Sequence, residues 1–113
     1  KGAIVNIVDI YAERPLAGHS VYSMAKAALA MMTQALALEL APDVRVNAIA
    51  PGAILWPDAG KDYADRDELV VRTPLKRTGS PEDVAAAALF LLRDAKFTTG
   101  QMIKVDGGRS LAV

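Results

Sequence analysis

Residues 44–52, Val-Arg-Val-Asn-Ala-Ile-Ala-Pro-Gly, decide the fold that we expect for this chain. They alternate like a β-strand as far as residue 50, and Pro-Gly then closes the strand. Before them, residues 21–41 are rich in strong helix formers and end at Pro42, which cannot continue a helix. Residues 2–8 are nearly continuously apolar, as in a strand buried on both faces. The sequence therefore predicts a strand–helix–strand unit.

The second half of the chain predicts another helix and a third strand. Ser80-Pro81-Glu82-Asp83 is typical of a helix start, and the helix is expected to run to about Arg93. Residues 101–105 form the last predicted strand, whereas residues 53–78 are the least regular part. Strands joined by long helical crossovers predict a parallel sheet with right-handed connections. The expected fold class is α/β, as one half of a doubly wound, Rossmann-type sheet.

The glycines suggest that the other half of this fold lies outside the chain. None of the eight forms the glycine-rich turn that cradles a dinucleotide pyrophosphate. A parallel strand at residues 2–8 also needs neighbouring strands and covering helices. We therefore expect residues 1–113 to be the C-terminal part of one Rossmann-type domain, without its dinucleotide-binding half.

Composition excludes several functional classes. The chain has 113 residues, of which 52% are hydrophobic, with 13 basic and 13 acidic side chains. Such a balanced charge predicts neither nucleic-acid nor membrane-surface binding. Cysteine is absent and there is one histidine, so we expect no disulfide and no metal site. The apolar stretches are expected to fall short of a bilayer span, which favours a soluble, cytoplasmic protein.

Tyr22 and Lys26 are the first candidate catalytic residues. They stand four residues apart at the start of the first predicted helix, so both side chains share one face. A cation at this position lowers the pKa of a neighbouring phenol, which makes it a better proton donor near neutral pH. On spacing alone, an ordinary surface pair is the favoured interpretation.

Asp9, at the end of the first strand, is the third candidate. Its carboxylate would repel the negative charge that grows on oxygen during ketone reduction, and would raise the pKa of Tyr22. Reduction of a C=N bond differs, because the ring nitrogen must gain a proton that an acid–phenol relay can supply. The alternative is an Asp that caps the turn after the strand.

Taken in order, these segments closely resemble the second half of a short-chain dehydrogenase/reductase. The resemblance implies that Tyr22 donates the proton, while Lys26 holds the nicotinamide ribose. It also implies that the backbone after the second strand meets the nicotinamide carboxamide. That segment consists of Pro51, Gly52, Ala53 and Ile54.

One position departs from the usual pattern of this family. Most members have a serine where this chain has Asp9, whereas pteridine reductases similarly pair an Asp with the Tyr. Leu55 and Trp56 occupy the positions where family members fold a loop over the substrate. Trp56 offers a flat face to a bicyclic ring, although it could equally anchor a core or an interface. Asn47 is expected to support the backbone beside Pro51 and Gly52.

The resulting hypothesis is an NADPH-dependent reductase of a dihydropterin or dihydrofolate-like substrate. Two alternatives stay open: a short-chain carbonyl reductase that carries Asp9 in place of serine, and a non-catalytic binding protein on the same fold. The preference for NADPH comes wholly from the resemblance. The resemblance also implies a homotetramer or homodimer formed through the helix of residues 22–41.

Overall fold

The computed structural model describes residues 1–54 and 66–112, with only the backbone of Arg66. Three parallel strands form its sheet in the order β1-β2-β3. They are β1 (Gly2–Ile7), β2 (Val44–Pro51) and β3 (Met102–Val105). In the register, Val5 pairs with Asn47, and Ile49 pairs with Ile103. The predicted parallel α/β sheet is confirmed.

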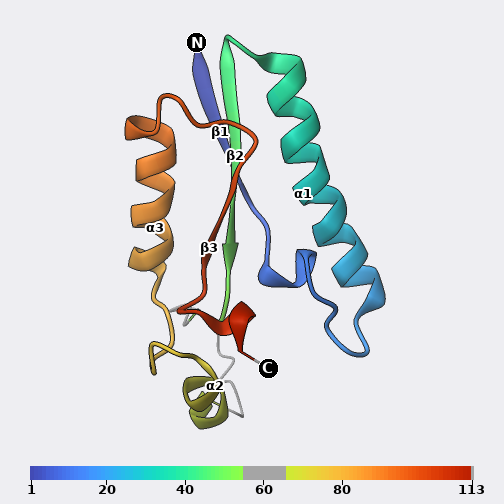
Figure 1. The fold of residues 1–113 in the computed structure, drawn as a ribbon, viewed down its shortest axis with the longest axis vertical. Helices are drawn as coiled ribbons and strands as arrows, with labels where there is room; N and C mark the ends of the chain where they lie inside the picture. Colours follow the sequence, from blue (N-terminus) through green and yellow to red (C-terminus); the bar gives the residue numbers. More distant parts are fainter. Residues whose placement is uncertain (55–65, 113) are drawn as a thin grey trace.

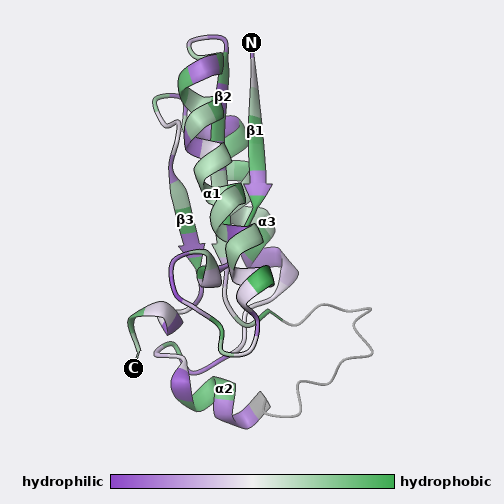
Figure 2. Cartoon of the chain, turned by 90° about the vertical axis from the view of Figure 1, so that its right-hand side faces the viewer, coloured by the Kyte–Doolittle hydropathy of each residue, from purple (hydrophilic) through white to green (hydrophobic). Residues whose placement is uncertain are grey.

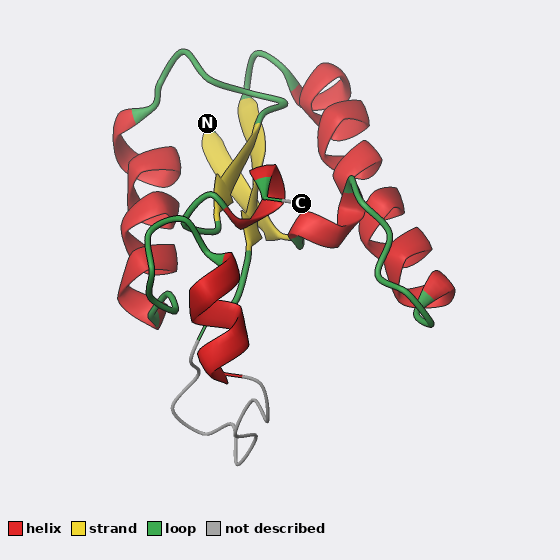
Figure 3. Cartoon of the chain, turned by 60° about the horizontal axis from the view of Figure 1, so that its bottom comes forward, coloured by secondary structure: helices red, strands yellow, loops and turns green. Residues whose placement is uncertain are grey.

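Helices cover both faces of the sheet. The long helix α1 (Ser20–Leu40) lies on one face and α3 (Pro81–Leu89) on the other (Figure 1). A short helix, α2 (Arg66–Arg72), lies beyond the carboxyl ends of the strands (Figure 3). Two 3₁₀ turns follow strands: η1 (Ile10–Ala12) after β1 and η3 (Arg109–Leu111) after β3.

The core lies between the sheet and α3. Ile49 and Leu91 are fully buried there, and partly buried side chains of β1 and β3 pack against them. On the α1 face, Asn6 Nδ2 donates a hydrogen bond to Thr33 Oγ1 at 3.0 Å. This contact fixes α1 on β1 through two polar groups, of which Thr33 is buried.

Helix α3 begins as its sequence predicts but ends differently. Ser80 Oγ accepts from the Asp83 amide, and the Asp83 carboxylate accepts from the Ser80 amide, which completes a capping box. The α-helix ends at Leu89 and continues as a π-helix, η2 (Phe90–Asp94). Arg45 accounts for the change, because its guanidinium donates to the carbonyl oxygens of Leu91, Leu92 and Ala95 at 2.7–3.1 Å.

Helix α1 corrects one expectation. Within the described residues, its 21 residues are long and apolar enough, by length and composition, to cross a membrane (Figure 2). The expectation that every apolar stretch falls short of a bilayer span is therefore wrong. Length and composition alone are weak evidence for a membrane segment, because the core helix of a soluble protein meets the same criteria.

Asn47 corrects another expectation. Its Nδ2 donates to the Thr98 carbonyl, and its Oδ1 accepts from the Gln101 amide, each at 3.0 Å. The side chain does support backbone, but it supports the segment that enters β3 rather than Pro51 and Gly52.

Candidate active site

The candidate catalytic residues lie at the carboxyl ends of the parallel strands. Asp9 follows β1, Tyr22 and Lys26 occupy the start of α1, and the turn of residues 51–54 follows β2. In open α/β sheets, ligands bind outside the carboxyl ends of the strands. The fold therefore brings the predicted residues to the edge where this architecture binds its ligands (Figure 1).

Asp9 and Tyr22 are in direct contact. The Tyr22 hydroxyl donates to Asp9 Oδ2 at 2.6 Å, a short, charge-assisted hydrogen bond. The second carboxylate oxygen, Oδ1, accepts from the Tyr11 amide at 3.0 Å and caps η1. The two interpretations of Asp9 are therefore compatible, because one oxygen caps the turn and the other binds the phenol.

Lys26 lies over the ring of Tyr22. Its Nζ is 5.7 Å from the ring centroid, within the range of a cation–π contact. The spacing predicted that both side chains share one helix face, and the structure confirms it. Lys26 thus approaches the phenol from its ring, whereas Asp9 approaches from its hydroxyl.

The acidity of Tyr22 differs from the expectation based on Lys26. The pKa of Tyr22 is raised to about 12, first by burial, then by its hydrogen bond to Asp9 and by the charge of Asp9. The predicted lowering by Lys26 is wrong for this arrangement, because burial and the carboxylate both favour the protonated phenol.

The turn after β2 is fixed by backbone bonds on two sides. The Gly52 amide donates to the Val105 carbonyl at 3.0 Å, and the Gly79 amide donates to the Ala53 carbonyl at 2.9 Å. Pro51 and Ile54 are buried. The four residues assigned to the nicotinamide therefore form a rigid turn at the carboxyl ends of the strands, the same edge of the sheet at which Tyr22 lies. Leu55 and Trp56, assigned to the substrate, lie outside the described residues.

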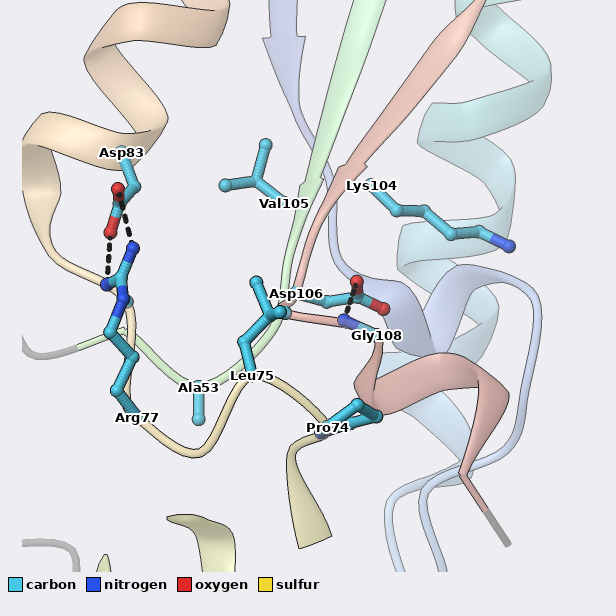
Figure 4. A pocket seen from close by; sticks show the side chains of 11 residues that line it. Ala53, Pro74, Leu75, Arg77, Asp83, Lys104, Val105, Asp106 and Gly108 are labelled. Carbon is cyan, nitrogen blue, oxygen red and sulfur yellow. Dashed lines mark hydrogen bonds and ion pairs between the residues drawn. The ribbon is translucent and has the colours of Figure 1, made fainter.

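A pocket of about 520 Å³ opens on the other side of this turn (Figure 4). Ala53 belongs to its lining, but Asp9, Tyr22 and Lys26 do not. Its charged groups already have partners: Arg77 pairs with Asp83 at 2.9 Å, Lys104 pairs with Glu13 at 2.7 Å, and the Asp106 carboxylate accepts from the amides of Gly108 and Ser110. We do not assign this pocket to the reaction. No group of three metal-ligating side chains occurs within residues 1–54 and 66–112.

The sequence did not predict a role for two further residues near the site. Glu13 and Arg14 follow η1 and contact the C-terminal segment of the chain. Their partners are separated from them by about ninety positions or more, and the local sequence carries no signal for contacts of that range.

Comparison with known proteins identifies the family. Residues 1–110 match the profile of the family described as enoyl-(acyl carrier protein) reductase. The chain belongs to this family. Its fold is that of the short-chain dehydrogenases/reductases, as in the ligand-free aldohexose dehydrogenase of Thermoplasma acidophilum, which superposes with a TM-score of 0.89 at 34% identity. That match covers 98% of this chain and 49% of the other.

Among curated relatives, the chain is similar to several enzymes of this kind. It is 45% identical to L-xylulose reductase of Caenorhabditis elegans, over 97% of this chain and 46% of that protein. It is 42% identical to pteridine reductase 1 of Leishmania tarentolae, over 96% of this chain and 38% of that protein. The chain thus spans less than half the length of these relatives. Sequence identity relates the chain to short-chain oxidoreductases of several kinds and does not single out the pteridine reductases.

Proposed function

We propose that the complete protein containing this chain is an NADPH-dependent reductase of the C=N bond in a pterin or dihydrofolate-like substrate. The observation that carries this proposal is the 2.6 Å hydrogen bond from the Tyr22 hydroxyl to Asp9. A carboxyl group joined to the catalytic phenol suits proton delivery to nitrogen better than stabilisation of an oxyanion.

The contact provides a route for the proton. With Asp9 protonated, its O–H donates to the Tyr22 oxygen, and the Tyr22 hydroxyl is free to donate to the ring nitrogen. As that nitrogen takes the Tyr22 proton, Tyr22 takes the Asp9 proton, and solvent then reprotonates Asp9. The phenol never becomes a free phenolate, so its high pKa is no obstacle to transfer.

The residues present fit the nicotinamide end of the cofactor. The turn after β2 is held in place by the Gly52 and Gly79 amides, and Lys26 places an ammonium group beside the Tyr22 ring. Lys26 would hold the ribose hydroxyls, and residues 51–54 would hold the carboxamide through backbone groups. When bound, NADPH supplies the hydride for the carbon of the C=N bond.

A carbonyl reductase is the second candidate. The names of the similar relatives favour it: carbonyl reductase family member 4 of Danio rerio is 46% identical over 97% of this chain and 46% of that protein. The two candidates differ in what Asp9 must do. A ketone needs a donor toward its oxygen, whereas a ring nitrogen needs an acid.

We also propose that α1 joins two copies of the protein. Its exposed residues include a stripe spaced alternately by three and four positions, the pattern that packs two helices together. The stripe consists of Val21, Met24, Ala28, Met31, Ala35 and Leu38. Large apolar side chains dominate it, and Leu38 is 85% exposed in the single chain.

The experiment that tests the function is steady-state kinetics of the complete protein with NADPH. Wild type should reduce a dihydropterin faster than simple ketones, and Tyr22→Phe should abolish turnover while NADPH binding, followed by fluorescence, survives. General acid catalysis is typically worth about 10²–10⁴-fold in rate. Unchanged turnover of Tyr22→Phe would contradict the proposal and return Tyr22 and Lys26 to the role of a surface pair.

A further inference from the structure

The loop that carries Asp9 contacts the C-terminal part of the chain through Arg14 and Glu13. Arg14 Nη1 donates to the carbonyl oxygens of Arg109, Ser110 and Ala112, each at 3.4 Å. Each of these hydrogen bonds is long, and the contact consists of one guanidinium group that interacts with three carbonyl groups at once. Beside it, Glu13 forms an ion pair with Lys104 of β3 at 2.7 Å.

This attachment is one turn away from Asp9. The 3₁₀ turn η1 begins at the Asp9 cap and ends at Glu13, whose amide donates to the Ile10 carbonyl. The Ala12 amide also donates to the Asp9 carbonyl at 3.0 Å. Ile10 is buried and holds η1 against the protein interior. The contacts at the other end of η1 therefore control how the turn is oriented. A rotation of η1 moves the Asp9 carboxylate relative to the Tyr22 hydroxyl.

The C-terminal segment is itself rigid enough to serve as an anchor. The Asp106 carboxylate accepts from the amides of Gly108 and Ser110 at 3.0 and 2.9 Å. The Leu75 amide donates to the Gly107 carbonyl at 3.1 Å, which joins the same turn to the segment after α2. Figure 4 shows Lys104 extending away from Val105, toward the loop after β1.

We propose that Arg14 is a positioning residue that, together with Glu13, anchors the Asp9 loop to the C-terminal turn and so holds the Asp9 carboxylate against the Tyr22 hydroxyl. The proposal rests on the proposed function for the chemistry of Asp9 and Tyr22. The anchoring contact itself can be tested without any substrate.

The kinetic test compares Arg14→Ala and Arg14→Lys in the complete protein. A misplacement of 1 Å can cost about 100-fold in rate, so Arg14→Ala should lower kcat for a dihydropterin on the order of 10-fold or more. The KM for NADPH should stay within about twofold, because residues 51–54 and Lys26 are untouched. Arg14→Lys keeps a cation beside the three carbonyl oxygens and should recover most of the lost kcat.

Arg93→Ala is the matched control. Arg93 is an exposed arginine that pairs with its neighbour Asp94 at 2.8 Å, and it lies in η2, away from the Asp9 loop. This variant should keep the wild-type kcat. An equal loss in Arg14→Ala and Arg93→Ala would overturn the proposal, because it would show a general effect of removing charge.

Hydrogen exchange followed by mass spectrometry supplies the measurement that needs no turnover. In Arg14→Ala, a peptide covering residues 9–16 should exchange faster, while a peptide from β2 should be unchanged. Unchanged exchange of residues 9–16, or faster exchange with wild-type kcat, would overturn the proposal. If instead the wild type reduces only ketones, the proposed function fails, and exchange together with the ketone kcat still decides the role of Arg14.

A charge swap covers the case in which Arg14→Ala does not fold. Glu13→Lys alone places two ammonium groups together and should lower kcat. The double variant Glu13→Lys with Lys104→Glu restores the pair in reverse and should recover kcat. Failure of the double variant to recover activity, with intact folding, would overturn the anchoring role.

Discussion

Gly52 and Asp106 approach each other more closely than two side-chain-bearing residues can. A Cβ atom built on Gly52 would lie 2.8 Å from the Cβ of Asp106 and 3.0 Å from its Cα. Gly52 follows β2 and Asp106 follows β3, and the two chain segments are bonded here through the Gly52 amide and the Val105 carbonyl. The turn assigned to the nicotinamide therefore depends on a residue without a side chain.

Gly52→Ala should both destabilise the protein and weaken cofactor binding. Overpacking a close contact typically costs about 1–3 kcal/mol, and here the neighbour is backbone and Cβ rather than a flexible side-chain end. Relief of the clash must displace residues 51–54, so the KM for NADPH should rise. Urea unfolding and steady-state kinetics measure the two effects. Gly2→Ala is the control, because nothing lies within 4 Å of its added Cβ; equal behaviour of the two variants would contradict the prediction.

Asp83 should make stability depend on pH. Arg77, and then the Ser80 amide, hold the pKa of the Asp83 carboxyl well below its usual range. A group with a lowered folded-state pKa contributes stability above its unfolded-state pKa, and that contribution is lost as the pH falls. Urea midpoints of wild type and Asp83→Asn should therefore differ at pH 7, and the difference should begin to shrink as the pH falls below about 4, the ordinary pKa of Asp. A constant difference across this range would contradict the assignment.

The elements of this fold were largely predictable because their signals are local. Residues 2–8, 44–50 and 101–105 carry apolar patterns that predict strands, and the observed strands differ from them by one residue at an end. The Ser80 capping box is equally local, since its partners lie three residues apart. By contrast, the π-helix that ends α3 depends on Arg45, 46 to 50 positions earlier, and no local pattern reports such a bond.

The site divides in the same way. The helix spacing of Tyr22 and Lys26 placed them on one face, and the family resemblance added Asp9 to them. The prediction that Asp9 raises the pKa of Tyr22 is confirmed, but the larger effect of burial was not predicted, because burial depends on packing rather than on residue types. The contacts of Arg14 were not predicted either, because its partners are backbone carbonyl oxygens, which every residue has and which no sequence pattern distinguishes.

The stripe on α1 predicts how the protein assembles. Leu38→Glu places a charge in a helix–helix contact and should shift the complete protein to a smaller species in sedimentation velocity experiments. Val71→Glu is the matched control, since Val71 is also exposed, at 67%, but lies on α2. If Leu38→Glu sediments like wild type, α1 is not the interface. If both variants dissociate, added charge rather than the stripe is responsible.

Asp9 should select between the two candidate substrates. Asp9→Ser removes the acid and should lower dihydropterin reduction by about 10²-fold or more, the range of general acid catalysis. Reduction of ketones should hold or improve, because a hydroxyl can donate toward an oxyanion and because loss of Asp9 lowers the pKa of Tyr22. Asp9→Asn is the matched variant of equal size, which keeps an oxygen for the Tyr11 amide but cannot relay a proton.

The pH profile tests the state of Tyr22. Burial, and then the hydrogen bond to Asp9, raise the pKa of Tyr22 to about 12, so the phenol keeps its proton throughout pH 4–8. Loss of the Tyr22 proton should therefore not limit the rate in this range. Asp9→Asn, which cannot relay a proton, should lose most of the dihydropterin rate at every pH tested. Equal losses on dihydropterin and ketone in Asp9→Ser would leave Asp9 as the cap of η1 and favour the carbonyl reductase.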